Sequence, residues 1–424
     1  MVRSGLGAVA LVLVAAAAHA QLRGHGGPVR GLAIAPDGKA AISGSFDTSV
    51  IRWSLEQNAA VEVLRFHDGA VNAVTLLRDG RTATAGEDTR IALWKPGEAE
   101  PVGVLTGHKA PVVALAASPD GTMLASASWD HTARVWPLGG GEARVLAGHK
   151  DNVNGIAFTP DGKSVVTAGY DATLRIWPLA GSAPEIVTLP TPLNTVAVAP
   201  DGEIVAAGAD GTVYVLAANG QRRGEVAVGN VPIIAVSIAP DGRRVAAAGI
   251  RGSVAIIDRA ARKLERTLVG PGLPVWSVAF FPDSRALLTG GTDRMIRRWD
   301  AIKGEPIGTV VMGAPEDPLA AHAGDPGAEV YRACVACHTL KASDGVRAGP
   351  TLHGIFGRRI ASLPGYNFSE ALRKMDIVWT PETVSKLFEV GPNAYTPGTK
   401  MPEQRIGSPA DRAALMRFLE QATK

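Results

Sequence analysis

The sequence predicts a seven-bladed, all-β propeller followed by a small all-α domain. A repeat of about 40 residues, the length of a four-stranded propeller blade, recurs from Arg23 to about Met312. The chain of 424 residues contains 49 glycines and 29 prolines, which indicates many turns. After the last repeat the periodicity stops and a Cys-x-x-Cys-His motif follows. We therefore expect a propeller over residues 21–312, a linker over 313–324 and a second domain over 325–424.

The first 20 residues have the pattern of a secretory signal peptide. Arg3 supplies a positive charge, residues 6–18 are apolar, and Ala18-His19-Ala20 matches a cleavage signal. The alternative is an uncleaved anchor, but the apolar run is shorter than the ~20 residues that a membrane span needs. We expect cleavage after Ala20, a periplasmic location, and a mature protein without a membrane span.

The composition bears on two other classes of protein, nucleic-acid binders and disulfide-dense scaffolds. Forty-three Lys and Arg residues balance 40 Asp and Glu residues, so the net charge of +3 gives no reason to expect nucleic-acid binding. Two cysteines are too few for a disulfide-dense scaffold.

Four markers keep phase through the repeats. They are a Gly-His pair, a Pro-Asp-Gly turn, an Asp, and a Trp six residues after that Asp. In this respect the region resembles the WD40-repeat family. The resemblance implies a hydrogen-bonded tetrad in each complete blade, with a structural and not a catalytic role. In the third blade its members are His108, Ser126, Asp130 and Trp136.

Two blades and the ring closure depart from this pattern. The fifth blade has Pro190 and Leu216 in place of the His and the Trp, and Arg251 stands where the sixth blade should have its Asp. Their apolar runs still fit a sheet, so we keep seven blades. Only residues 21–24 precede the first marker histidine, His25, and residues 306–312 resemble an outer strand. We therefore expect the last blade to close without borrowing an N-terminal strand.

The second domain contains an attachment motif for c-type haem, Cys334-Val-Ala-Cys337-His338. Asp325 and Pro326 offer a helix start, and we expect that helix to run into the motif with both cysteines on one face. The alternatives are a thioredoxin-like redox pair and half of a zinc site. A zinc site would need further ligands at matching spacing, and the sequence has no other cysteine. A redox pair does not need the adjacent histidine. The motif predicts one covalently attached haem c.

From Gly324 to Lys424 the sequence closely resembles class I cytochrome c, especially the bacterial c2 type. The predicted fold is thus an all-β propeller followed by an all-α class I cytochrome c domain. A C-terminal helix opens at Ser408-Pro409, and the resemblance implies that it crosses the first helix near Gly327 and Tyr331. The matching stretches are residues 349–354, 355–358, 365–369, 377–379 and 395–401.

The resemblance also implies a haem site. His338 is the proximal iron ligand and Met401 the distal one, and the Pro350 carbonyl accepts a hydrogen bond from the other nitrogen of His338. The alternatives are a core or loop methionine at 401, a solvated arginine at 358 and a core tryptophan at 379. The residues expected around the haem propionates are Arg358, Ser369, Trp379 and Thr399.

Three positions depart from the family. Phe368 replaces a propionate-bonding Tyr, Leu372 an Asn, and Leu387 a Tyr near the Met sulfur. We expect a drier pocket, which disfavours the more charged oxidised iron. The reduction potential should therefore be at least as high as that of ordinary c2-type cytochromes.

The leading functional prediction is an electron-transfer protein, not an enzyme, whose propeller docks protein redox partners. The family has lysines around the haem edge that dock acidic partners, whereas here only Lys400 adjoins the ligand loop. Residues 315–424 hold 13 basic and 12 acidic residues, so a cationic haem face gives little support to partner choice. One alternative is an oxidoreductase with a catalytic propeller. A metal centre there is disfavoured because His131 is the only propeller histidine outside the tetrads, whereas a quinone-type site stays open. The other alternative is a redox-sensing assembly platform.

A basic run also allows two interpretations. Residues 221–266 hold nine Arg or Lys against four acids, including Arg243, Arg244 and Arg251. This run is either a solvated blade surface, which we favour, or a docking face for an acidic partner.

Overall fold

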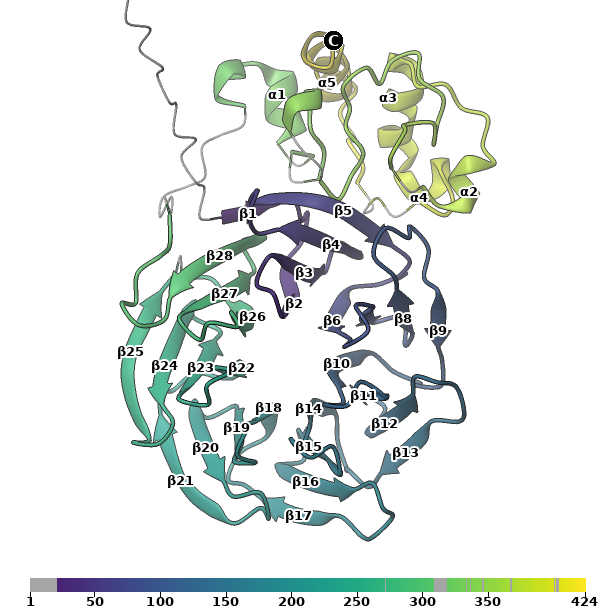
Figure 1. The fold of residues 1–424 in the computed structure, drawn as a ribbon. Helices are drawn as coiled ribbons and strands as arrows, with labels where there is room; N and C mark the ends of the chain where they lie inside the picture. The colour runs from purple at the N-terminus through teal and green to yellow at the C-terminus, as the bar shows by residue number, and fades with distance from the viewer. Residues whose placement is uncertain are drawn as a thin grey trace, which may run out of the picture.

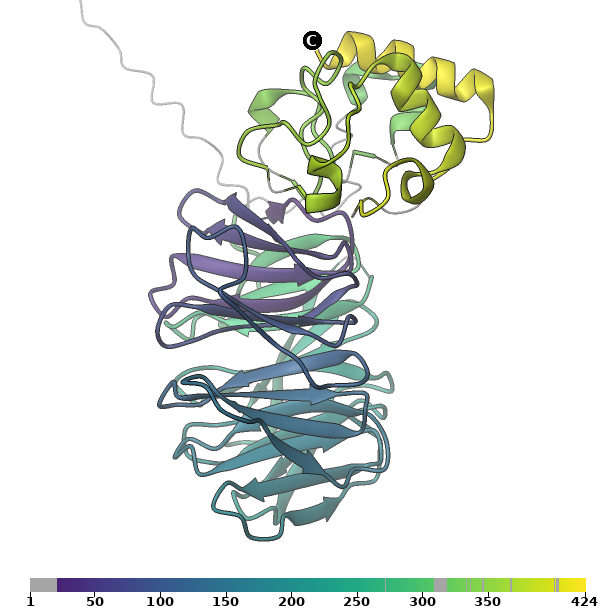
Figure 2. The same cartoon turned by 90° about the vertical axis from the view of Figure 1, so that its right-hand side faces the viewer.

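A computed structural model places a ring of β-sheets beside a small helical domain (Figures 1 and 2). It describes residues 21–270, 272–308, 319–332, 334–335, 337–344, 347–366, 368–399, 401 and 404–424. The predicted signal peptide, residues 309–318 and Lys400 lie outside the described residues. In the part of the chain that is described, no helix is long and apolar enough to cross a membrane.

Seven four-stranded antiparallel sheets form the ring, which confirms the predicted seven blades. Blade one contains β2 (Val29–Ile34), β3 (Ala40–Ser45), β4 (Ser49–Ser54) and β5 (Ala59–Arg65). Blade two contains β6 (Val71–Leu76), β7 (Thr82–Gly86), β8 (Ile91–Trp94) and β9 (Gly103–Leu105). Blade three contains β10 (Val112–Ala117), β11 (Met123–Ser128), β12 (Thr132–Pro137) and β13 (Arg144–Ala147).

The fourth to sixth blades repeat this arrangement, and the seventh recruits the first strand of the chain. Blade four contains β14 (Val153–Phe158), β15 (Ser164–Gly169), β16 (Thr173–Pro178) and β17 (Glu185–Thr188), and blade five contains β18 (Leu193–Val198), β19 (Ile204–Gly208), β20 (Thr212–Leu216) and β21 (Arg222–Ala227). Blade six contains β22 (Ile233–Ile238), β23 (Arg244–Gly249), β24 (Ser253–Asp258) and β25 (Lys263–Val269). Blade seven contains β26 (Val275–Phe280), β27 (Ala286–Gly291), β28 (Met295–Asp300) and, from the start of the chain, β1 (Gln21–Arg23).

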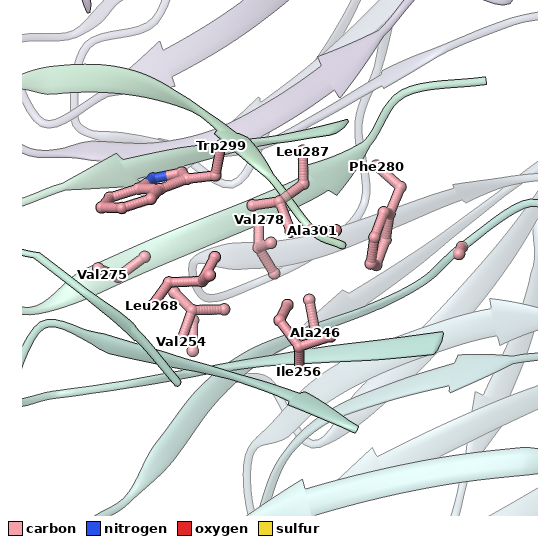
Figure 3. Packing of buried hydrophobic residues seen from close by; sticks show 12 residues of the cluster. Ala246, Val254, Ile256, Leu268, Val275, Val278, Phe280, Leu287, Trp299 and Ala301 are labelled. Atoms are coloured by element: carbon pink, nitrogen blue, oxygen red, sulfur yellow. The ribbon is translucent and has the colours of Figure 1, made fainter. Parts of the chain in front are cut away.

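Apolar side chains between neighbouring blades form the core of the ring. Figure 3 shows one such cluster, in which Val254 and Ile256 of blade six face Val278 and Phe280 of blade seven. These side chains are buried, and burial of this kind contributes about 25 cal/mol per Å² of apolar surface removed from water. Packing between blades, repeated around the ring, therefore holds the sheets together.

The expected tetrad is present in the third blade. His108 Nδ1 lies 2.8 Å from Asp130 Oδ2, and its Nε2 lies 2.8 Å from the Ser126 hydroxyl. The indole of Trp136 donates to the same hydroxyl at 2.8 Å. Each buried polar group thus finds a partner within the blade. The tetrad prediction is confirmed, and blades one, two and four contain the same arrangement around His25, His67 and His149.

Blades five and six form complete sheets without complete tetrads. In blade five the Tyr214 hydroxyl donates to Asp210 at 2.5 Å, and Leu216 fills the tryptophan position fully buried. In blade six β22 to β25 pair in the usual order. Apolar packing therefore maintains the blade geometry where the polar markers are missing.

The expectation of closure without a borrowed strand is wrong. Strand β1 pairs antiparallel with β28, with Leu22 opposite Ile296, and supplies the outer strand of the last blade. Within the described part of the expected outer strand, which ends at Gly308, the Ile307 amide donates to the Arg298 carbonyl at 2.9 Å, and residues 309–312 lie outside the described residues. Leu22 is 4% exposed within the core shared by blades one and seven, so burial of this side chain explains why three residues suffice.

The C-terminal domain is a small helical unit at the rim of blade one (Figure 2). Leu319 and His322 lie within the range expected as linker, yet Leu319 is buried in this domain and the His322 ring contacts Phe418. Its helices are η1 (Ala320–His322), α1 (Pro326–Tyr331), η2 (Ala342–Asp344), α2 (Glu370–Arg373), α3 (Pro381–Val390), α4 (Pro392–Tyr395) and α5 (Pro409–Ala422).

The first and last helices cross as expected. The Asp325 side chain caps α1 by accepting from the Gly327 amide at 2.7 Å. A Cβ at Gly327 would collide with the Ala414 carbonyl of α5, so the crossing requires glycine there. The Tyr331 and Phe418 rings pack 5.5 Å apart beside it. This crossing fixes the end of α1 from which the haem motif continues.

The expectation that this helix runs into the haem motif is wrong, because α1 ends at Tyr331. The chain continues in tighter turns: the Cys334 amide donates to Tyr331, and the Cys337 amide to Cys334, at 2.8 and 3.1 Å. Such three-residue hydrogen bonds are common where an α-helix ends. The His338 amide then donates to Cys334 at 3.0 Å, which keeps the motif compact.

Candidate haem site

A single cavity brings together every residue predicted for the haem site. Its empty space is about 1390 Å³ including the open mouth, and its wall is mainly apolar. The nine predicted residues that line it are Cys334, Cys337, His338, Pro350, Arg358, Ser369, Trp379, Thr399 and Met401. Two thiols, an imidazole and a thioether facing one apolar cavity are the donor set that a covalent haem requires.

The surrounding backbone fixes the His338 ring. Its Nδ1 lies 2.8 Å from the Pro350 carbonyl oxygen, and an N–H donated there leaves the Nε2 lone pair for iron. A Cβ at Gly349 would lie 2.5 Å from Cε1 of the ring, so only glycine permits this close approach. The imidazole is therefore held in one orientation before a metal binds.

Burial sets the protonation of these groups. It raises the pKa of the Cys334 thiol to about 12 and that of Cys337 to about 11. It also lowers the pKa of His338, so the imidazole is neutral near pH 7. Neutral thiols are poor nucleophiles, which does not suit a redox dithiol. Among the described residues, no group of three or more His, Cys, Asp and Glu side chains is arranged to hold a metal.

Hydrogen bonds fix the Met401 loop at the wall of the cavity. The Met401 amide donates to the Thr399 hydroxyl at 3.1 Å, and the Ser369 hydroxyl donates to the Gly398 carbonyl at 2.8 Å. Met401 itself packs against the core of the domain. These bonds hold the loop over the cavity, so the distal-ligand role stays a consistent prediction for this methionine.

Arg358 and Trp379 support the loop beneath the cavity. Arg358 donates to the carbonyls of Thr351 and His353 at 2.8 and 3.2 Å, and burial lowers the pKa of its guanidinium. The Trp379 amide donates to the Arg358 carbonyl at 2.9 Å. Both side chains line the cavity, where the haem carboxylates remain their predicted partners.

The three departures from the family line the cavity as well. Phe368, Leu372 and Leu387 present apolar side chains where the family has hydroxyl or amide groups. The apolar surface of this wall is consistent with the predicted drier pocket.

Two cavity residues were missed by the sequence because they belong to the propeller. Asp47 and Arg65 of blade one line the same cavity, and the Arg65 guanidinium carbon lies 4.2 Å from the centre of the Tyr366 ring. The Ala348 amide also donates to the Gly24 carbonyl at 2.9 Å. Docking of one domain on another leaves no local pattern, so no motif marks Arg65, and the repeat pattern marks Asp47 only as the tetrad aspartate of blade one.

Comparison with known families agrees with both halves of this architecture. The family described as "WD domain, G-beta repeat" matches residues 18–54, 59–95, 99–137, 140–178, 185–215 and 262–300. The "Cytochrome c" family matches residues 324–423. The chain is a WD40-repeat protein with a cytochrome c domain. The WD40 match omits residues 216–261, where the sixth blade lacks the His, Asp and Trp markers but keeps its sheet.

Individual relatives resemble the cytochrome c domain alone. Cytochrome c of Cochliobolus lunatus is 43% identical over 99 residues, which are 23% of this chain and 91% of that protein. Cytochrome c of Arabidopsis thaliana is 42% identical over 99 residues, 23% of this chain and 88% of that protein. Cytochrome c type-1 of Ascaris suum is 39% identical over 101 residues, 23% of this chain and 87% of that protein. The cytochrome c domain of this WD40-repeat protein therefore carries covalently bound haem c and serves haem-based electron transfer.

Proposed function

We propose that this protein is an exported, periplasmic electron carrier whose propeller docks the protein redox partner. The observation that supports it most is the shared cavity of Cys334, Cys337, His338 and Met401. When bound, haem c supplies a one-electron iron couple. The cysteines anchor it and the apolar wall excludes water. His338 and Met401 would both hold the iron, and such ligation would favour electron exchange over substrate binding.

Exposed apolar side chains support a docking role for the propeller. Phe46, Trp129 and Tyr170 are 39%, 39% and 45% exposed, and each directly precedes the tetrad Asp of its blade. Equivalent positions lie at the same end of successive blades, so these side chains belong to one face of the ring. Exposed aromatic side chains are enriched at protein interfaces.

The basic run of blades five and six gives less support to a docking face for acidic partners. Arg244 pairs with Glu265 at 2.8 Å, and Arg259 pairs with Asp201 and Glu203 at 2.6 Å each. Neutralisation within the propeller favours the interpretation as a solvated surface.

Export and haem attachment can be tested together. The full chain is expressed in a bacterium that has haem-attachment machinery, and the fractions are stained for haem. We expect a periplasmic haem protein whose N-terminal residue is Gln21, and no staining for the Cys334→Ala/Cys337→Ala variant. A cytoplasmic product, or a colourless one, would contradict the proposal. Substrate turnover by the purified protein alone would favour the oxidoreductase alternative.

Docking can be tested with redox proteins encoded by neighbouring genes. Oxidation of the ferrous haem by such a protein is followed by stopped flow, with ferricyanide as a small oxidant. We expect Trp129→Asp and Tyr170→Asp to slow oxidation by the protein at least tenfold without affecting ferricyanide. Ile186→Asp, on the exposed outer strand β17, is the matched control. Equal rates for all variants would contradict docking through this face.

A further inference from the structure

Blade one of the propeller forms part of the wall of the haem cavity. A Cβ at Gly26 would collide with the Cys337 sulfur, the atom expected to bind the haem edge. Next to it, the Gly24 carbonyl accepts the Ala348 amide at 2.9 Å. The propeller therefore meets the cytochrome c domain at the cofactor site itself.

Arg65 is the propeller side chain best placed to contact the cofactor. It ends β5, the outer strand of blade one, and it lines the cavity beside Tyr366. Its guanidinium carbon lies 4.2 Å from the Tyr366 ring centre, so one face of the guanidinium is covered. Its Nη2 nitrogen is buried, and no hydrogen-bond partner for it occurs within the described ranges. A buried, unpartnered guanidinium nitrogen is costly unless a ligand supplies an acceptor.

The carboxylate that lines the cavity together with this arginine, Asp47, is already engaged. Asp47 lies 3.0 Å from His25 Nδ1, accepts the Gly26 amide at 2.6 Å and accepts the Ser49 hydroxyl at 2.6 Å. No ion pair between Arg65 and a carboxylate occurs in the part of the chain that the structure describes. Guanidinium groups bind carboxylates through two parallel hydrogen bonds, and haem carries two propionate carboxylates.

We propose that Arg65 of the propeller binds a haem carboxylate, so that the cofactor is held by both domains. The inference rests on the haem site described above and adds a residue from outside the cytochrome c domain. The positive charge of Arg65 disfavours the more positive oxidised iron, and its pairing keeps the propionate ionised. Arg65 therefore raises the reduction potential and lowers the pH at which the propionate titrates.

The test compares full-length haem-loaded variants by visible spectrum and by redox titration from pH 5 to pH 9. We expect Arg65→Gln to keep the spectrum, to lower the midpoint potential and to shift its pH-dependent region upward. Arg65→Lys, which keeps the charge but loses the planar fork, should fall between this variant and the parent. Arg266→Gln is the matched control, since Arg266 is a half-buried arginine on the outer strand β25.

Two results would overturn the proposal. The first is an unchanged midpoint potential in Arg65→Gln. The second is a lower potential with an unchanged pH profile, which would mean that Arg65 acts on the iron by charge alone. A parent protein without a His/Met-type spectrum would instead contradict the proposed ligation, so the two failures are distinguishable.

Discussion

The Arg65 guanidinium and the Tyr366 ring, 4.2 Å apart, join blade one of the propeller to the cytochrome c domain. Arg65 also lines the haem cavity, so this contact lies at the cofactor site and not at a remote surface. A substitution on the propeller can therefore change the surroundings of the haem.

Loss of one tetrad member should destabilise the propeller. In His108→Ala, the Ser126 hydroxyl and the Asp130 carboxylate both lose a buried partner, which should cost about 2–3 kcal/mol. Tryptophan fluorescence during urea unfolding measures the change. The control is His131→Asn, at an exposed position of the same blade whose positive φ asparagine tolerates. Equal losses in both variants would show that the tetrad has no special role.

The tetrad aspartates predict a dependence of stability on pH. Hydrogen bonds from Thr132, His108 and the Lys109 amide outweigh desolvation and lower the pKa of Asp130 to about 2. Because the folded pKa lies below the unfolded value of ~4, this carboxylate stabilises the protein above pH 4, and the contribution is lost as the pH falls towards 2.

Asp130→Asn tests this dependence. We expect it to lower the free energy of unfolding by roughly 2 kcal/mol at pH 7, with a difference that shrinks near pH 2. Asp37→Asn, in an exposed turn, serves as the control. A difference that stays constant across this range would contradict the assignment.

Because β1 closes the ring, substitution of its middle residue, Leu22, should strongly lower the free energy of unfolding. Leu22→Asp places a charge in the core shared by blades one and seven, so unfolding should become easier by at least ~3 kcal/mol. Arg23→Gln, at the exposed end of the same strand, should change little. A Leu22→Asp protein as stable as its parent would mean that the ring does not depend on this strand in solution.

The haem ligands can be tested by binding of carbon monoxide. Met401→Ala should open the distal position, so the ferrous protein binds carbon monoxide that the parent excludes. Met375→Ala, at a methionine that does not line the cavity, should behave like the parent. Binding by the parent itself would contradict Met401 as a ligand.

The apolar wall of the cavity predicts a high reduction potential. Leu372→Asn and Leu387→Tyr restore polar groups, which favour the oxidised iron and should lower the midpoint potential in a redox titration. Leu387→Met keeps the wall apolar at nearly constant volume and should have no effect. Higher midpoint potentials in Leu372→Asn and Leu387→Tyr would contradict this prediction.

The sequence predicted the features that local pattern determines. The tetrad around His108 and the cavity residues from Cys334 to Met401 follow from resemblances to two families, each carried by motifs along the sequence. The pairing of β1 was missed because three residues are too few to show a periodicity. Arg65 was missed for another reason: it reaches the cavity only because two separately folded domains meet there.

The residues that follow β1 give the N-terminal segment two tasks. Gln21 to Arg23 complete the seventh blade, and directly afterwards Gly24 and Gly26 touch Ala348 and Cys337. Residues 21–26 thus close the propeller ring and also hold the cytochrome c domain against it. Detachment of this segment should open the ring and separate the two domains at the same time. The stability of the propeller and the protection of the haem edge from solvent are therefore coupled.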